Sequence, residues 1–342
     1  FNKAYILFIS CMKKILIFTR CSWTLINFRY DYIKFIINKN FNVTVACDFK
    51  NSELLKLKKL FPLVKFVKIN FLNESKSLFN EFKICYQIIR LFLKSKFNII
   101  HNFTIRPVIY STLIGKLLTT SNIINSITGL GHVFNNKKSF FFKLLINTVY
   151  ISSNYIIFQN KDDFFDSSYK FLRNKISYTI IFPTIKEKIK MQILKKRKPK
   201  NIIKKKIIFL MFCRLIEQKG VREFLNAAKY INEEKKKLNS EFRLFGNIDL
   251  NNPSSLRKSE LNFWKKKKYI KILKHTDLID QEIIKSDIIC LPSYGEGMPA
   301  SLLEALYFSK GIITTNVNGC KEVVKNNYNG YIVPKKKPPF SC

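Results

Sequence analysis

Short runs of β-branched and aromatic residues recur along this chain, and a stretch long enough for a helix follows each of them. Residues 15–19 form the first run, residues 25–38 carry apolar side chains at helical spacing, and residues 42–47 form the next run. Parallel strands need a helical crossover, so this alternation predicts an α/β fold with helices on both faces of a parallel sheet. Such sheets bind ligands at the carboxyl ends of their strands.

The expected strands fall into two series separated by a charge-rich segment, residues 185–206. The first series comprises residues 15–19, 42–47, 99–101, 122–126 and 155–158, and the second comprises residues 207–212, 241–245, 270–272, 288–291, 311–314 and 330–333. A chain of 342 residues is long enough for two domains. We therefore expect a Rossmann-like domain at residues 12–184, a basic linker at 185–206 and a second Rossmann-like domain at 207–342.

The segment Ser-Tyr-Gly-Glu-Gly-Met-Pro-Ala-Ser-Leu-Leu-Glu contains two carboxylates, Glu296 and Glu304, eight positions apart. Gly295 and Gly297 fit a loop in which backbone comes close to a ligand, and a helix is expected to start near Met298. The N–H groups at a helix start favour a phosphate, and the carboxylates accept hydroxyl groups. The pattern suits a nucleotide-sugar, although a surface loop with two solvated carboxylates is consistent with the same sequence.

This carboxylate spacing resembles the E-x7-E signature of family 4 glycosyltransferases. Residues 213–220, Cys-Arg-Leu-Ile-Glu-Gln-Lys-Gly, resemble the family's G-R-L-x-x-x-K-G phosphate clamp, with Cys213 in the place of its first Gly. Residues 101–107 and 126–131 resemble the capsule and O-antigen branch of the family. The resemblance spans roughly residues 12–334. It implies two Rossmann-like domains facing a central cleft, the glycosyltransferase-B arrangement, with the second domain ending early at residues 335–342.

The resemblance implies a retaining, metal-independent glycosyltransferase of the hexosyltransferase type. It would move a sugar from a nucleoside-diphosphate donor, UDP by expectation, to a lipid-linked or glycan acceptor in surface polysaccharide synthesis. The residues expected to take part in catalysis are Glu296, which would hold the transferred sugar, and His101 and Arg106, which would face acceptor or sugar. The residues expected to bind the donor are Arg214 and Lys219 on the diphosphate, Glu304 on the ribose, and Gly295, Gly297, Met298, Thr128, Gly129 and Asn27. Arg29 would join Asn27 in closing on the donor, whereas His132 does not align with the family's histidine.

No cofactor or metal is expected. The eight cysteines contain no Cys-x-x-Cys pair, the chain has only three histidines, and no Asp-x-Asp occurs. Arginine and lysine with a helix start can neutralise a diphosphate without an ion.

The formal net charge of +38 fits an anionic partner. The joint abundance of Lys, Ile, Asn and Phe indicates a coding bias that accounts for part of it. No nucleic-acid-binding signature accompanies the charge, so we expect no nucleic acid partner and favour an anionic membrane surface. Residues 137–146, with three consecutive Phe among Lys residues, are a candidate contact. The expected location is cytoplasmic, peripheral on the inner face of the plasma membrane.

Two other classes of protein are consistent with the same sequence features. A sugar-nucleotide epimerase shares the double-Rossmann architecture and needs no acceptor. A non-catalytic basic protein that binds membrane or nucleic acid would bind no UDP.

Overall fold

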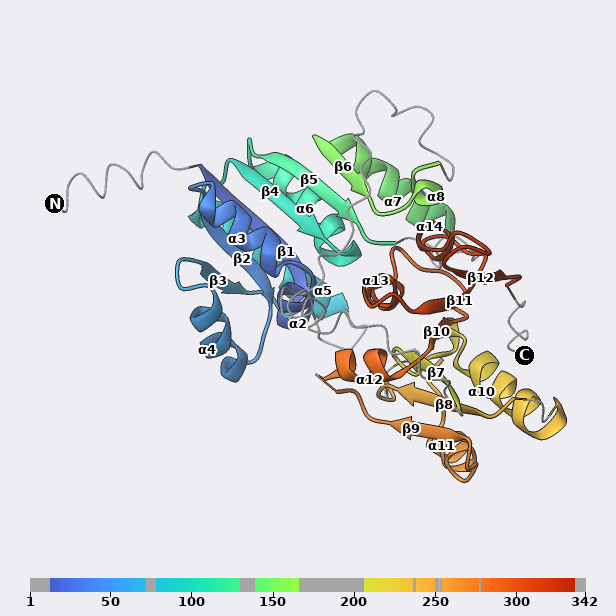
Figure 1. Cartoon of the computed structure of the whole chain (residues 1–342). Coiled ribbons are helices and arrows are strands. Elements are labelled where there is room, and N and C mark those ends of the chain that lie inside the picture. The colour runs from blue at the N-terminus through green and yellow to red at the C-terminus, as the bar shows by residue number, and fades with distance from the viewer. Residues whose placement is uncertain are drawn as a thin grey trace. The chain divides into compact units, whose positions relative to one another are not determined.

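Both series of strands form parallel sheets in a computed structural model (Figure 1). The structure describes residues 13–71, 78–129, 139–165, 206–235, 238–249, 252, 254–276 and 278–335. The chain divides into two compact units, residues 1–184 and residues 185–342. The expected linker lies outside the described residues except for Lys206, and residues 137 and 138 of the candidate membrane segment lie outside them too. Across the described ranges, no helix has the length and apolarity that spanning a bilayer requires.

Unit 1 contains a six-stranded sheet with the order β3-β2-β1-β4-β5-β6. Its strands are β1 (Lys14–Cys21), β2 (Asn42–Asp48), β3 (Lys65–Lys68), β4 (Ile99–Phe103), β5 (Asn122–Ile127) and β6 (Tyr155–Phe158). Its helices are α2 (Ser22–Phe28), α3 (Tyr30–Asn38), α4 (Asn51–Leu60), α5 (Leu78–Lys94), α6 (Ile105–Leu118), α7 (Ser139–Ser152) and α8 (Lys161–Phe165). Every neighbouring pair of strands is parallel, and the order is that of a doubly wound nucleotide-binding fold.

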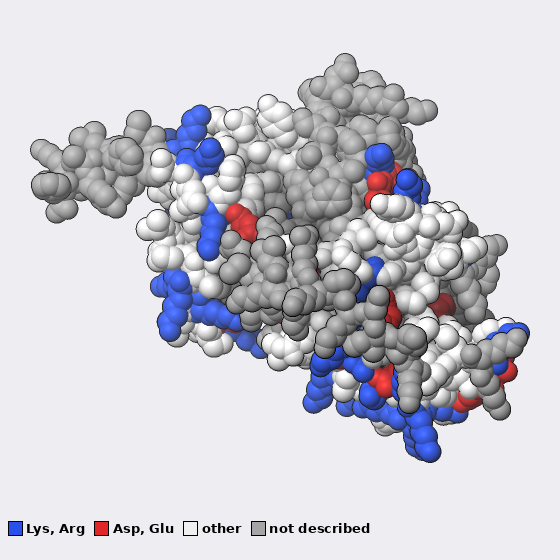
Figure 2. Space-filling view, in the orientation of Figure 1, with Lys and Arg blue, Asp and Glu red and all other residues white. Residues whose placement is uncertain are grey.

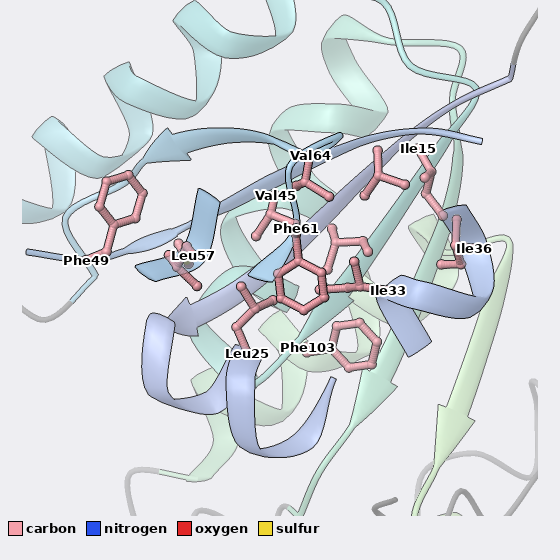
Figure 3. Packing of buried hydrophobic residues seen from close by; sticks show 13 residues of the cluster. Ile15, Leu25, Ile33, Ile36, Val45, Phe49, Leu57, Phe61, Val64 and Phe103 are labelled. Carbon is pink, nitrogen blue, oxygen red and sulfur yellow. The ribbon is translucent and has the colours of Figure 1, made fainter. Parts of the chain in front are cut away.

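The two faces of β1 are covered by different helices, because successive side chains of a strand point to opposite faces. Ile15 and Ile17 belong to a buried cluster that Leu25 of α2 and Ile33 of α3 complete (Figure 3). Leu16 and Phe18 belong to a second buried cluster, which contains residues of α5. A strand buried on both faces reads as a continuous apolar run, which explains why β1 was recognisable in the sequence.

Two local expectations for unit 1 were wrong. The helix expected over residues 25–38 is two helices, α2 and α3, separated at Arg29. Strand β3 was not expected, because its sequence Lys-Phe-Val-Lys is short and its outer positions are charged and exposed. As an edge strand it is buried on fewer sides, so it lacks the apolar run that marks the inner strands.

Unit 2 repeats the same strand order, β12-β11-β10-β7-β8-β9. Its strands are β7 (Ile207–Phe212), β8 (Ser240–Phe245), β9 (Ile270–Leu273), β10 (Ile288–Leu291), β11 (Gly311–Thr315) and β12 (Gly330–Val333). Its helices are the 3₁₀ turn η2 (Glu217–Lys219), α10 (Val221–Lys229), the π-helical η3 (Tyr230–Lys235), α11 (Lys258–Lys265), α12 (Ile279–Lys285), α13 (Ala300–Tyr307) and α14 (Cys320–Val323). The expected α/β class with two Rossmann-like sheets is therefore confirmed.

The positive charge of unit 2 is concentrated beside α11 and β9, at the bottom of the view in Figure 2. The exposed cations there are Arg257, Lys258, Lys265, Lys266, Lys268, Lys271 and Lys274. Lys271 pairs with Glu241 at 3.1 Å, and the side chains of the whole set are exposed to solvent.

Each sheet has one point where the chain reverses its direction of growth. In unit 1 the reversal lies between the neighbouring strands β1 and β4, and in unit 2 it lies between β7 and β10. Loops leave the carboxyl ends of the two strands in opposite directions at such a point and open a crevice, where ligands of this fold class bind.

Candidate active site

Three loops interlock at the carboxyl edge of the unit 2 sheet, after β7, β10 and β11. The Ser293 hydroxyl and the Tyr294 N–H both donate to the Gln218 carbonyl at 2.9 Å, which ties the β10 loop to the β7 loop. The Glu296 N–H donates to the Asn318 carbonyl at 3.2 Å, which ties the β10 loop to the β11 loop. Backbone carbonyls accept all three hydrogen bonds, so the positions of the backbone set the shape of this edge.

Two glycines allow the loops to approach this closely. Gly220 has φ +73°, and a Cβ there would lie 2.0 Å from the Pro292 carbonyl oxygen. Gly319 has φ +75°, and a Cβ there would lie 2.4 Å from the Gly297 carbonyl oxygen. Both positions combine a left-handed backbone with contact to neighbouring backbone, so only glycine fits.

The closed loops bring Lys219 and Glu296 together. The Lys219 ammonium donates to a Glu296 carboxylate oxygen at 2.6 Å, and the side chains are 22% and 11% exposed. Seventy-seven positions of sequence separate them, and the β7–β10 reversal point joins them. Two residues expected from different motifs thus form one partly buried ion pair at the position where this fold class binds ligands.

Arg214 lies on the same β7 loop in a looser setting. Its side chain is 62% exposed, and its guanidinium lies 3.6 Å from the Asp249 carboxylate. An exposed ion pair of this length contributes little stability, so Arg214 can exchange Asp249 for a phosphate at low cost.

The remaining unit 2 residues surround the start of α13. Gly295 and Gly297 are half-buried in the loop, and Met298 is 7% exposed, which leaves its N–H rather than its thioether for a ligand. Helix α13 starts at Ala300 with no acidic residue in its first turn, so its amide groups can receive an anion. Glu304 is half-buried and lies just over one turn into α13, because the helix starts at Ala300, two residues after the expected Met298.

In unit 1 the structure gives His101 partners on both ring nitrogens. Nδ1 shares a 2.5 Å hydrogen bond with the Tyr32 hydroxyl, and Nε2 shares a 2.9 Å hydrogen bond with the Ser126 hydroxyl. His101 is 4% exposed, and burial, with the nearby Arg29 charge, lowers its pKa to about 3. A neutral imidazole with a hydrogen bond at each ring nitrogen orients its neighbours. The expected contact of His101 with a substrate stays a prediction.

Arg106 and Asn27 are also engaged within unit 1. Arg106 donates to the Phe71 carbonyl at 2.7 Å and forms an ion pair with Glu81, which also accepts from Tyr110. Asn27 donates to the Trp23 carbonyl at 2.8 Å, one turn earlier in α2. These contacts join α5 to α6 and support α2, so the expected substrate contacts of both residues remain untested.

Thr128 and Gly129 follow β5 at the carboxyl edge of the unit 1 sheet. Thr128 is half-buried, Gly129 is exposed, and Gly129 has φ 125°, which favours glycine. Their position is consistent with a donor contact, which stays a prediction. Residues 130–138, including His132, lie outside the described residues.

Sequence reasoning missed two features of the unit 2 site. The Tyr294 hydroxyl donates to Glu223 at 2.5 Å, which fixes the loop next to Gly295 onto α10. The Cys213 thiol lies on the clamp, and burial raises its pKa to about 12, so it stays protonated. A tyrosine beside a glycine loop was visible in the sequence, but its partner 71 positions away was not.

No group of three or more His, Cys, Asp or Glu with the geometry of a metal site occurs among the described residues. The groups that converge at the unit 2 edge are instead cations, backbone amides and two carboxylates.

Two protein families match the chain, one on each half. Residues 192–339 match the family described as "Glycosyl transferases group 1", and residues 14–160 match "Glycosyl transferase 4-like".

Two curated enzymes are similar in sequence. "UDP-Gal:alpha-D-GlcNAc-diphosphoundecaprenol alpha-1,3-galactosyltransferase" from Escherichia coli is 26% identical over 75% of this chain and 67% of that enzyme. "N,N'-diacetylbacillosaminyl-diphospho-undecaprenol alpha-1,3-N-acetylgalactosaminyltransferase" from Campylobacter jejuni is 35% identical over 38% of this chain, and the match spans about a third of that enzyme, 32%. Among solved structures, a glycosyltransferase from Rickettsia africae superposes with a TM-score of 0.67 at 18% identity, covering 96% of this chain and 85% of that one. The last likeness concerns the fold alone.

Proposed function

This chain belongs to the family 4 glycosyltransferases, and on that premise we propose that it transfers a sugar from UDP to a polyprenol-diphosphate-linked glycan. The two curated relatives are named for transfer to undecaprenol-diphosphate-linked acceptors, and one of them is named for a UDP-sugar donor.

One observation carries the assignment of roles. Lys219 and Glu296 are paired at 2.6 Å at the β7–β10 reversal point, beside the glycine loop and the start of α13. A cation and helix amides suit the diphosphate, and a carboxylate suits the hydroxyl groups of the sugar next to it. Arg214, on the same loop as Lys219, supplies the second cation.

The reaction breaks the bond between the anomeric carbon and the diphosphate oxygen, and forms a bond from that carbon to an acceptor hydroxyl oxygen. Negative charge grows on the departing diphosphate, and the acceptor hydroxyl gives up its proton to it. Arg214, Lys219 and the loop amides are placed where that charge develops, so they stabilise the transition state more than the ground state. We propose attack on the face that the diphosphate leaves, which retains the anomeric configuration.

Glu296 and Glu304 divide the donor between them in this proposal. Glu296 holds the transferred sugar, and Glu304, further along α13, holds the ribose. No metal step is required, because two cations and a helix start already face the diphosphate.

The test is a screen of nucleoside-diphosphate sugars with a polyprenol-diphosphate-linked acceptor, reading released nucleoside diphosphate and glycosylated lipid. The proposal expects UDP release that depends on acceptor. Interconversion of the free UDP-sugar without acceptor would identify an epimerase, and an absence of UDP binding would identify a non-catalytic binding protein. The sheet architecture fits all three, whereas the family matches favour the transferase.

We also propose that unit 1 rests on an anionic membrane at the inner face, where a lipid-linked acceptor resides, through the outer face of α5. This face exposes large apolar side chains: Leu78, Phe79, Phe82, Tyr86 and Leu93 are 76%, 76%, 72%, 63% and 72% exposed. Exposed cations on the same helix, Lys83, Arg90 and Lys94, complement anionic headgroups. An amphipathic helix that combines aromatic and basic residues binds the interfacial layer of a bilayer.

Sedimentation with vesicles of anionic and of neutral lipid tests the α5 surface. The variant Phe82→Ser/Tyr86→Ser is expected to lose vesicle binding and keep its affinity for UDP. The matched control is Leu55→Ser on α4, where Leu55 is 68% exposed but belongs to a different surface. Equal binding by the double variant and the wild type would exclude α5 as the contact.

A further inference from the structure

Arg29 is a buried cation at the junction of α2 and α3. The residue is 8% exposed, and within the described part of the chain its guanidinium donates one hydrogen bond, from Nη1 to the carbonyl of its neighbour Phe28 at 2.8 Å. No carboxylate among the described residues lies within ion-pair distance of it. A guanidinium held away from water without an anion is costly, and buried charges in proteins are normally paired.

The guanidinium is held in place by an aromatic platform. Its central carbon lies 4.2 Å from the centre of the Phe103 ring, and the His101 ring packs against the same phenyl ring at 4.1 Å. Phe103 is itself anchored in the buried cluster of Figure 3. Burial lowers the pKa of Arg29 to about 10, and that of His101 to about 3, so Arg29 alone carries charge here at neutral pH.

The position of Arg29 in the fold matches the ligand position of unit 2. Arg29 joins α2 to α3 after β1, and Phe103 ends β4, so their contact marks the β1–β4 reversal point of unit 1. In unit 2 the Lys219–Glu296 pair marks the equivalent β7–β10 point. The difference is that Lys219 has a carboxylate partner, whereas Arg29 has none among the described residues.

A helix start at the same place offers further donors. Helix α6 begins at Ile105, runs for 14 residues, and has neither a side-chain cap nor an acidic residue in its first turn. The residue before it, Thr104, has φ 70°, and its hydroxyl oxygen is buried without a hydrogen-bond partner. Free amide groups, an unpaired hydroxyl and a buried guanidinium are the donors that phosphate oxygens require.

We propose that Arg29, with the start of α6, binds a phosphoryl group of a substrate in unit 1, separately from the donor clamp in unit 2. This rests on the proposed function, in which two diphosphates are present, one in UDP and one in the lipid-linked acceptor. Because the unit 2 clamp already serves the donor, the acceptor diphosphate is the group assigned to Arg29.

The experiment compares Arg29→Met with Arg29→Lys and with the control Arg20→Met. Arg20 is an exposed residue of β1, close to Arg29 in sequence. Its replacement shows the effect of losing one positive charge without losing the buried guanidinium. Calorimetry measures binding of a short-chain polyprenyl diphosphate and, separately, of UDP. Thermal unfolding of the ligand-free proteins is measured alongside.

Arg29→Met is expected to weaken polyprenyl diphosphate binding at least tenfold, to leave UDP binding unchanged, and to keep or raise the ligand-free Tm, since it removes an uncompensated buried charge. Arg29→Lys should recover part of the affinity. A loss of UDP binding instead would overturn the assignment to the acceptor, because the phosphoryl group at Arg29 would then belong to the donor.

Unchanged binding of both ligands together with a lower Tm would overturn the proposal and make Arg29 a structural residue. An equal loss in Arg20→Met would overturn it as well, since diffuse charge would then explain the effect. Because binding is read without turnover, an inactive transferase would refute the proposed function and leave this result interpretable.

Discussion

Removing the Lys219 ammonium is the sharpest perturbation of the candidate site, because it affects stability and catalysis in calculable ways. Lys219→Met leaves the Glu296 carboxylate, 11% exposed, without the partner that lies 2.6 Å away in the wild type. Opposite charges at this separation attract by roughly 6 kcal/mol at an effective dielectric constant of about 20, and desolvation offsets much of this. We expect unfolding free energy to fall by about 2 kcal/mol in Lys219→Met.

Catalysis should fall further than stability. Losing one group that stabilises the departing diphosphate costs about 3 kcal/mol, so kcat/KM should fall on the order of 10²-fold or more. Glu296→Gln removes the other partner, and the double variant should lose less stability than the two single losses combined, by about 1 kcal/mol or more.

The assay is urea unfolding of the wild type, both single variants and the double variant, with UDP release measured on each. Lys267→Met is the control, because Lys267 pairs with Glu233 at 2.8 Å on a more exposed surface, so its loss should change stability little and leave turnover unaffected. Strictly additive stabilities would show that the Lys219–Glu296 pair does not form in solution. Wild-type turnover in Lys219→Met would refute the clamp.

Three further predictions follow from the same structure. Arg214→Ala should lower kcat/KM on the order of 10²-fold while changing Tm little, since its 3.6 Å contact with Asp249 is exposed; a large Tm loss with normal turnover would contradict this. Glu304→Gln should weaken UDP binding in calorimetry, whereas Glu296→Gln should spare free UDP and slow turnover, and equal losses would refute the division of roles. Burial alone would raise the pKa of Glu241, but hydrogen bonds from Arg243, Lys206 and Lys271 outweigh it and hold the pKa at about 2. This folded-state pKa lies below the unfolded value of about 4.3, so the ionised Glu241 stabilises the fold above about pH 4.3 by on the order of 3 kcal/mol, and the effect is lost as the pH falls towards 2. In urea titrations, Glu241→Gln should therefore be less stable than the wild type at pH 7 and equally stable near pH 2.

The sequence predicted eleven of the twelve strands in the described residues, all but β3, because these strands are short runs rich in apolar residues that the helices bury. The motifs of the candidate unit 2 site were recognisable for a related reason. Gly220 marks a turn where backbone approaches backbone, Gly295 and Gly297 lie in the loop after β10, and the clamp and carboxylate motifs lie directly after strands.

The sequence did not reveal which residues would meet. Lys219 and Glu296 lie far apart along the chain, and only the order of strands, set by long-range packing, makes β7 and β10 neighbours. The same holds for Arg29, which lies inside an apparently continuous helical pattern. Its burial against Phe103 depends on β4 being placed beside β1, and no local pattern encodes that.

His101 illustrates a different limit. A histidine at a strand end suits either a ligand contact or a structural hydrogen bond, and both ring nitrogens proved to have protein partners. Partners as distant as Tyr32 and Ser126 could be identified only from the structure.

The most direct test of the central claim is UDP release from a UDP-sugar by the wild-type chain, measured with and without a polyprenol-diphosphate-linked acceptor. The account predicts release that requires acceptor, matches glycosylated lipid one to one, and is lost in Lys219→Met. UDP-sugar turnover that proceeds equally without acceptor, or that survives in Lys219→Met, would contradict it.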